Sequence, residues 1–262
     1  MTVRDLLAGR TLAALVIGGL CAQPPARPAF DVTSVKQNKS VDRRFGIVPS
    51  PGGRVRATNA TLRQLINVAY QMLDFRISGN SGWTNTDRFD IEAKAAGDPP
   101  REQLLLMLQS LLADRFKLVA HRETRELPTY ELQVARGGPK LKEGKCVGQP
   151  GPANPCGGFN ASAWGHFVGK AAGIGQLTQF LSTLQSRVVV DKTGLTGEYD
   201  MELTWTPDEL PQGPGDPGQA PPDPNGPSIF TALQEQLGLH LEPSKGPVEI
   251  LVIDRAEKPA EN

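Results

Sequence analysis

The chain has 262 residues, and its 28 Lys and Arg balance its 28 Asp and Glu, so the formal net charge is zero. This balance argues against electrostatic binding of nucleic acid, because such binding requires a basic surface that displaces counterions from phosphates. The length allows one large domain or two domains of about 100 residues each. The 28 glycines and 23 prolines indicate a globular but loop-rich chain.

The N-terminus is typical of an export signal. Two arginines precede a short apolar run at residues 11–20, and Ala22 comes just before a proline cluster. So short a run is poorly matched to about 30 Å of hydrocarbon, which favours cleavage near Ala22 over a membrane span. We therefore predict a signal peptide at residues 1–22 and a mature chain without a membrane span, located in the periplasm or outside the cell. Lipidation at Cys21 and a retained anchor are the alternatives.

The first predicted unit covers residues 30–136 and alternates strands with two amphipathic helices. A capping-box pattern at Thr61–Gln64 opens the first helix, and Pro99-Pro100 precedes the second, where proline is tolerated in the first turn. The predicted strands are residues 30–36, 75–77, 89–95, 116–119 and 130–134. We predict that the last two strands form a hairpin that turns across the charged residues 122–126.

A glycine- and proline-rich linker is predicted at residues 137–158. It contains Cys146 and Cys156, the pair of cysteines that remains once the signal is removed. An even pair in an exported chain is most simply explained by a disulfide that closes a small loop. Free thiols and a metal site are the alternatives, although a metal would need further ligands and only His166 is near in sequence. We predict a disulfide and no metal.

The second predicted unit covers residues 159–258 and has the same order of elements. Its predicted strands are residues 166–170, 188–190, 199–205, 239–241 and 248–253, the last two as a hairpin. A proline- and glycine-rich insertion at residues 207–227 cannot supply a core, and we expect it to be mobile.

A short phrase occurs once in each unit. Residues 82–93 return, two residues shorter, at 194–203, each with a glycine turn, a threonine and a strand that reads aromatic-Asp-apolar-Glu-apolar. Such self-similarity indicates an internal repeat. We predict an α+β fold made by tandem duplication of a β-α-β-β-α-β-β module, with two helices packed on a small mixed sheet in each half.

No catalytic, cofactor-binding or metal-binding constellation stands out. The three histidines have neither HxH nor HxxxH spacing, and they are His121, His166 and His240. We therefore predict no catalytic residue, no cofactor and no metal. Trp83, at a turn, is the one residue that we expect to contact a ligand.

Four acidic residues in the repeated phrase also invite a chemical interpretation. These are Asp90 and Glu92, with Asp200 and Glu202 at the matching places. Acid–base catalysis by such a pair requires a pocket that separates the two pKa values, and no apolar pocket is evident. We interpret them as the charged outer face of a strand, which discourages edge-to-edge aggregation.

Four segments carry a resemblance to a known family, and they are residues 30–36, 82–91, 112–118 and 190–200. With them the chain resembles a family of exported bacterial proteins of unknown function, described as soil-associated. The domain also looks like one attached to membrane-bound sensor peptidases, which implies a sensing or interaction role by analogy. Each half is similar to the short N-terminal domains of secretins and TonB-dependent receptors, which bind partner proteins in the periplasm. No functional residue transfers.

We therefore predict an exported, non-catalytic protein-interaction or sensing module of the bacterial envelope, with an envelope or extracellular protein as partner. The partner would dock on an exposed sheet edge, a helix face or the groove between the modules. Strand addition to an open edge is the simplest mode, because main-chain hydrogen bonds need no special side chains. The alternatives are an envelope hydrolase with a site at the interface of the two modules and a purely structural envelope component.

Overall fold

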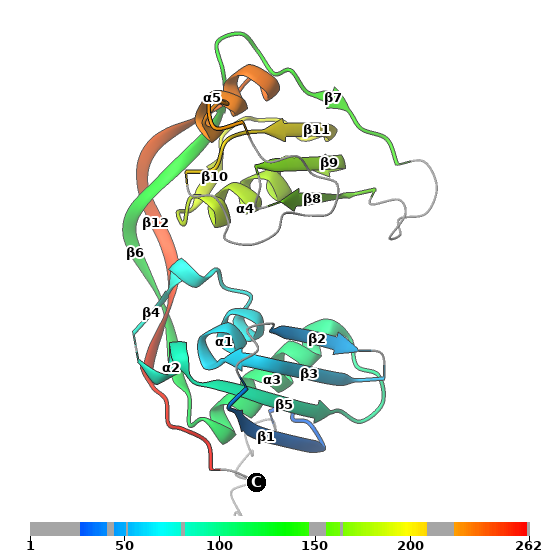
Figure 1. Ribbon diagram of the computed structural model, residues 1–262, viewed down its shortest axis with the longest axis vertical. Coiled ribbons are helices and arrows are strands. Elements are labelled where there is room, and N and C mark those ends of the chain that lie inside the picture. Colours follow the sequence, from blue (N-terminus) through cyan, green and yellow to red (C-terminus); the bar gives the residue numbers. More distant parts are fainter. Residues whose placement is uncertain are drawn as a thin grey trace, which may run out of the picture.

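Two long strands organise the molecule. A computed structural model describes residues 27–40, 45–50, 52–79, 82–146, 156–162, 165–208 and 223–260. In it, β6 (Val119–Val134) and β12 (Leu239–Arg255) pair antiparallel from end to end, with Val119 opposite Arg255 and Val134 opposite Leu239. This ribbon joins two α+β lobes into a C-shaped molecule that opens on the side away from the ribbon (Figure 1).

The ribbon overturns both predicted hairpins. Residues 122–126, predicted as a turn, lie inside β6, and the two strand segments predicted near the C-terminus are one continuous strand, β12. Residues 122–126 are themselves exposed or half-buried, so they have no apolar alternation to mark them as a strand. Charged cross-strand pairs occupy this segment instead, for example Arg122 with Glu249.

The first lobe is a four-stranded antiparallel sheet in the order β1-β5-β3-β2. Its strands are β1 (Val32–Asn38), β2 (Gly46–Ser50), β3 (Arg54–Thr61) and β5 (Arg88–Lys94). Its helical elements are α1 (Leu62–Tyr70), the 3₁₀ turn η1 (Asp74–Arg76), α2 (Trp83–Thr86) and α3 (Arg101–Arg115). The apolar faces of α1 and α3 pack with the inward residues of β3 and β5 in one buried cluster.

The start of α1 agrees with its sequence. Thr61 is the N-cap, where its hydroxyl accepts a hydrogen bond of 3.2 Å from the Gln64 N–H. The Gln64 side chain accepts one of 2.9 Å from the Thr61 N–H in return. This reciprocal pair satisfies two N–H groups that have no partner within the helix, so the predicted capping box is confirmed.

The second lobe is also a four-stranded antiparallel sheet, in the order β7-β11-β9-β8. Its strands are β7 (Lys142–Glu143), β8 (Gly158–Ser162), β9 (His166–Gly173) and β11 (Glu198–Thr204). Its helical elements are α4 (Ile174–Leu184), α5 (Ile229–Ala232) and the π-helical turn η2 (Leu233–Leu237). Together they enclose a second buried cluster.

The cores are not continuous in sequence. Leu251 and Ile253 of β12 are buried in the core of the first lobe, whereas Leu132 of β6 is buried in the core of the second. Each ribbon strand therefore leaves the lobe in which it begins and completes the core of the other lobe. The first core thus includes residues from the range predicted as the second module.

The ribbon also holds the only parallel pairing among the described residues. The short strands β4 (Ile77–Ser78) and β10 (Val189–Asp191) pair parallel with β12 and β6, giving a sheet in the order β10-β6-β12-β4. The α+β prediction is confirmed. A mixed sheet was predicted for each half, but the structure has one mixed sheet that both lobes share. Each lobe's own sheet is antiparallel. The reason is that β6 and β12 pair with each other instead of forming two separate hairpins.

Several predictions fall on residues outside the described ranges. The signal peptide at residues 1–22 lies there, as does most of the insertion at residues 207–227, and part of the linker. The two linker cysteines are described, and Cys146 is joined to Cys156 in a disulfide, as predicted. No helix in the described part of the chain combines the length and the apolar character that crossing a bilayer requires.

Candidate binding site between the lobes

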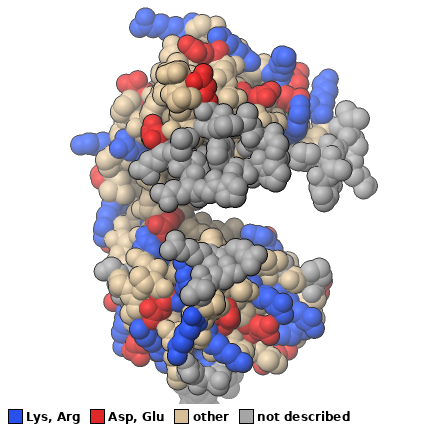
Figure 2. All heavy atoms as spheres, viewed as in Figure 1, with Lys and Arg blue, Asp and Glu red and all other residues tan. Residues whose placement is uncertain are grey.

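A cavity of about 460 Å³ lies between the two lobes, where α1 and α4 face each other. Its first wall is the C-terminal part of α1 and the turn that follows, with Arg76 and Arg101 beside it. Its second wall is one face of α4, from Gly175 to Ser182, with Val188 and Val189. Figure 2 shows the deep notch between the lobes in which this cavity lies.

Both helices that line the cavity end in the same way. After α1, Gln71 adopts a left-handed backbone (φ 50°) and the Met72 N–H donates 3.0 Å to the Asn67 carbonyl. After α4, Ser186 is left-handed (φ 46°) and the Arg187 N–H donates 3.2 Å to the Ser182 carbonyl. These bonds satisfy carbonyls at the helix ends and turn the chain sharply toward β4 and β10.

The hydroxyl groups in the cavity wall have structural partners. The Ser182 hydroxyl donates 2.7 Å to the Thr178 carbonyl and accepts 2.9 Å from the Val189 N–H. The Thr178 hydroxyl donates 3.0 Å to the Gly175 carbonyl. Ser182 therefore joins β10 to α4, and no described residue that lines the cavity is a base of the kind that activates a serine nucleophile.

The remaining polar groups of the cavity are amides and guanidinium groups. Asn67, Gln71 and Gln179 present side-chain amides, and none of the described lining residues is His, Cys, Asp or Glu. Arg76 is held by the ribbon, because its Nε donates 2.8 Å to the Glu249 carbonyl. The lining is thus rich in hydrogen-bond donors and positive in charge. It can hold a polar or anionic group, but it offers no pair of groups for acid–base chemistry.

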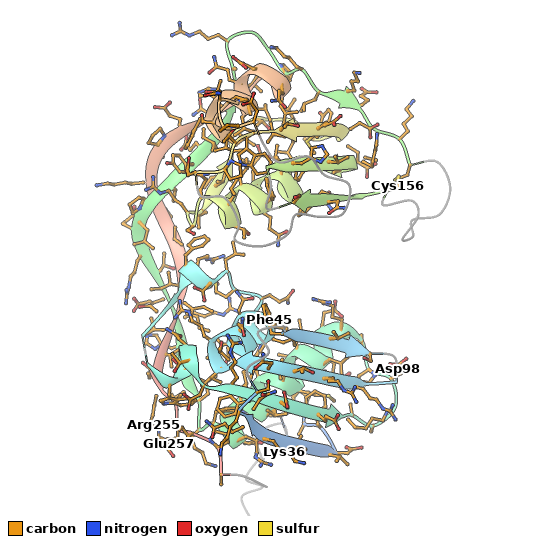
Figure 3. The ribbon with its side chains drawn as sticks, viewed as in Figure 1. Lys36, Phe45, Asp98, Cys156, Arg255 and Glu257 are labelled. Atoms are coloured by element: carbon orange, nitrogen blue, oxygen red, sulfur yellow. A yellow bond between two sulfur atoms is a disulfide. The ribbon has the colours of Figure 1, made fainter. Side chains whose placement is uncertain are left out.

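Two open sheet edges flank the notch. Strand β2 is the edge of the first lobe's sheet nearest the second lobe, and β8 is the edge of the second lobe's sheet nearest the first (Figure 1). Neither pairs with a further strand among the described residues. Pro49 removes one backbone donor from β2, whereas β8 has no proline. Phe45, labelled in Figure 3, is 56% exposed just before β2.

Trp83, the predicted ligand contact, is not among the residues that line this cavity. It is half-buried at the start of α2, where its ring packs edge-on against Phe89 with 6.3 Å between centroids. The Lys258 ammonium lies 5.9 Å from the centroid of the indole ring. Trp83 therefore packs against the core of the first lobe and against the C-terminal segment. Its role as a ligand contact stays a prediction.

The repeated aspartates are more than a charged strand face. Asp90 accepts 2.8 Å from the N–H of Asn59, a residue with φ 54° at a break in the β3–β5 register. Asp200 accepts 3.0 Å from the N–H of Ala171, which has φ 45° at a break in the β9–β11 register. In both lobes the carboxylate satisfies a backbone donor that the bulge takes out of the strand ladder.

This hydrogen bond also changes the acidity of Asp200. The Ala171 N–H, and then the nearby Lys170 ammonium 3.3 Å away, lower the pKa of the carboxyl below its ordinary value, although partial burial acts in the opposite direction. Glu202, two residues on, is exposed and lies 3.3 Å from His166 Nε2. The two aspartates thus bind backbone N–H groups at bulges, whereas Glu202 lies exposed on the strand face. Only the exposed position matches the interpretation made from the sequence.

The histidines are dispersed. His121 lies on the ribbon, with Nδ1 2.9 Å from Asp254 and Nε2 3.6 Å from Glu123, and the hydrogen bond to Asp254 raises its pKa above the ordinary value. His240 is on β12 at the far end of the ribbon, and its buried Nδ1 has no hydrogen-bond partner within the described ranges. Within the described ranges no three His, Cys, Asp or Glu side chains are grouped as metal ligands.

The residues of the cavity were not found from the sequence. Arg76, Arg101 and the three amides lie on separate elements of two lobes, and no local spacing links them. The groove between the modules was one of three docking regions predicted from the sequence, and its role stays a prediction. The residues that line it depend on how the lobes face each other.

Taken together, these features define a two-lobed α+β protein with a polar cavity between its lobes. Residues 63–256 match a family described as proteins of unknown function, DUF3738, and the chain belongs to this family. The matched region begins in α1 and ends just after β12, so it includes the second lobe, the ribbon and the part of the first lobe from α1 onward. Comparisons with curated proteins and with solved structures found no match.

Proposed function

We propose that this protein is an exported, non-catalytic interaction or sensing module of the bacterial envelope, which holds an extended segment of a partner protein between its two lobes. The observation that carries the proposal is the cavity of about 460 Å³ with walls from both lobes. Its polar lining has hydrogen-bond donors to offer, and a site between two domains is a common location for ligands. The same lining gives the hydrolase alternative no support among the described residues.

Strand addition is the proposed mode of binding, and β8 is the proposed edge. Its five residues contain no proline, so every residue retains a backbone N–H, and the strand is short enough to stay unpaired without aggregating. Phe159 on β8 is packed against Phe167 and Phe180, with ring centroids 5.2 and 6.0 Å away, which keeps the edge in place. A preformed edge lowers the entropic cost of adding a strand.

We also infer that the two lobes are copies of one module. Support comes from the order of elements, which is shared once the short α2, η1 and η2 are set aside: β3-α1-β4-β5-α3-β6 and β9-α4-β10-β11-α5-β12. The bulges tied by Asp90 and Asp200 and the similar ends of α1 and α4 add to it. The resemblance of each half to the N-terminal domains of secretins and TonB-dependent receptors, which bind envelope partners, agrees with this proposal.

Export is proposed from two further observations. The N-terminal sequence has the charge and apolar pattern of a signal peptide. The disulfide between Cys146 and Cys156 is of the kind that persists outside the cytoplasm.

The proposal is tested by photo-crosslinking in intact cells. A photoreactive amino acid is placed at Gln179, in the cavity wall, or as a matched control at the exposed Gln234 on η2, which does not line that cavity. We expect a discrete adduct with another protein from position 179 that co-production of excess unlabelled chain suppresses, and none from position 234. Equal adducts at both positions, or none at position 179, would contradict the proposal.

Strand addition is tested by introducing a lysine on the edge strand β8. A lysine at an edge strand opposes pairing with a further strand. We expect Asn160→Lys on β8 to reduce the adduct from position 179, and Gln37→Lys on the remote edge strand β1 to leave it unchanged. Equal yields from the two variants would place the partner elsewhere than on β8.

A further inference from the structure

The charge of the cavity between the lobes is one-sided. Arg76 and Arg101 both line it, and no Asp or Glu is among its described lining residues. Arg101 is the first residue of α3, is exposed, and has no ion-pair partner in the part of the chain that the structure describes. A guanidinium with five N–H donors in such a position is able to bind an anion.

The surrounding acidic residues do not cancel this charge. Glu249 lies 3.9 Å from Arg76, but the same carboxylate also contacts Arg122, so two guanidinium groups share it. Glu102 follows Arg101 in α3, and consecutive helical residues point in different directions, so the two side chains do not face each other. The cavity therefore keeps an excess of positive charge.

Arg76 is also held in a defined orientation. Its Nε donates 2.8 Å to the Glu249 carbonyl on the ribbon, and its side chain is only 25% exposed. Fixing the guanidinium in this way lowers the entropy that would be lost when a ligand binds. The amides of Asn67, Gln71 and Gln179 add donors that match the second oxygen of a carboxylate or a peptide carbonyl.

We propose that the partner segment bound between the lobes is acidic, and that a side-chain carboxylate of that segment is bound by Arg101 together with Arg76. This inference rests on the proposed function and specifies its ligand. Arginine binds a carboxylate through two parallel hydrogen bonds, so one acidic position in the partner is enough to orient an extended segment across the cavity. Arg101 is the better target for a test, because it is exposed and has no ion-pair partner to lose among the described residues.

The test uses display of random extended peptides against the immobilised mature chain, residues 23–262. Three baits are compared: the unchanged chain, Arg101→Gln, and Arg136→Gln as the matched control. Arg136 is exposed and lines a different cavity, at the far end of the second lobe. Thermal unfolding first establishes that all three baits are folded.

We expect Asp and Glu to be enriched at one position among peptides bound by the unchanged chain and by Arg136→Gln, and not among those bound by Arg101→Gln. One selected peptide and its Glu-to-Gln analogue are then measured by fluorescence anisotropy. The loss of one charge-assisted pair should weaken binding about tenfold, and more at low salt than at high salt. The analogue should bind both arginine variants alike.

Three outcomes would overturn the inference: no selected peptides, peptides without acidic enrichment, or enrichment that persists with Arg101→Gln. Each is distinguishable from failure of the proposed function. If Arg101→Gln leaves the adduct from position 179 intact, the partner still binds between the lobes, but its carboxylate is not what Arg101 recognises.

Discussion

The carboxylate of Asp200 accepts a hydrogen bond of 3.0 Å from the backbone N–H of Ala171, a residue held at φ 45°. This bond crosses from β11 to β9, where the two strands fall out of register. A non-glycine residue in the left-handed region is unfavourable unless its surroundings hold it there. The aspartate therefore stabilises a backbone conformation of its neighbouring strand, and the stability of the second lobe should depend on it.

Removing this carboxylate should destabilise the lobe. We expect Asp200→Ala to lower the free energy of unfolding by about 1–2 kcal/mol, because the Ala171 N–H loses its acceptor. Asp200→Asn should cost less, because the amide oxygen still accepts that bond. Urea unfolding measures both variants. Equal losses in the two variants would mean that the charge matters and the hydrogen bond to Ala171 does not.

The contribution of Asp200 should depend on pH. Its pKa is lower in the folded protein than the ordinary value of 3.8, chiefly because of the Ala171 N–H and then Lys170. A depressed folded pKa gives a stabilising contribution that is present above about pH 4 and is lost as the pH falls through the folded pKa. Urea unfolding from pH 7 to pH 3 should therefore show the stability gap between the native chain and Asp200→Asn closing at the acid end. A gap that stayed constant would contradict the depressed pKa.

Because the ribbon strands contribute to the cores of both lobes, substitutions at the two ends of β12 should destabilise different lobes. Leu251 is 1% exposed in the core of the first lobe, although it lies near the C-terminus, and Leu241 is 7% exposed in the core of the second. Truncation of either to alanine should cost about 2–4 kcal/mol. Hydrogen exchange should show Leu251→Ala loosening α1 and α3, and Leu241→Ala loosening α4. The reverse assignment would refute the exchange of ribbon strands between lobes.

Two glycines should respond oppositely to alanine. Gly238 has φ 65°, and a Cβ there would clash with the Gly138 carbonyl oxygen, so Gly238→Ala should destabilise by about 2 kcal/mol or more. Gly175 in α4 has nothing within 4 Å of such a Cβ. Gly175→Ala should therefore stabilise by about 0.5–1 kcal/mol, because alanine has less backbone freedom to lose. Thermal unfolding compares the two variants, and a destabilised Gly175→Ala would show that this helix position is more crowded than described.

His121 on the ribbon should contribute to stability with a pH dependence opposite in sign to that of Asp200. Asp254, and then Glu123, raise the pKa of His121 above the ordinary value of 6.5. A raised folded pKa gives a stabilising contribution that is fully present below about pH 6.5 and is lost as the pH rises through the folded pKa. NMR titration should find the His121 pKa lowered by Asp254→Asn and lowered less by Glu123→Gln. An unchanged titration in Asp254→Asn would rule out the pairing.

Reduction of the disulfide should lower the stability of the protein without disrupting its two buried clusters. The disulfide joins residues separated by 10 positions, and closing so short a loop stabilises by about 2–3 kcal/mol on the chain-entropy model. A reducing agent should lower the midpoint of thermal unfolding, and the Cys146→Ser/Cys156→Ser double variant should have the same lowered midpoint and no further response. A response of the double variant to the reducing agent would point to an effect unrelated to this bond.

The sequence by itself determined the local elements. The capping box at Thr61, the apolar-acidic alternation of β5 and β11, and the disulfide were all predicted, because each depends on residues close together in the chain. The repeated aspartates were noticed for the same reason. Their function was missed, because the N–H groups that they bind belong to bulges on neighbouring strands, at Asn59 and Ala171.

Only the tertiary structure decided the ribbon and the cavity. Residues 122–126 of β6 are charged or polar and lack an apolar period, so they were predicted as a turn. Their pairing with β12 leaves no local signal in the sequence. The cavity arises where helices from two lobes face each other, and Arg76, Arg101 and Gln179 meet there because β6 and β12 hold those lobes apart at a set spacing. Contacts between distant residues depend on chain geometry that local periodicity does not encode.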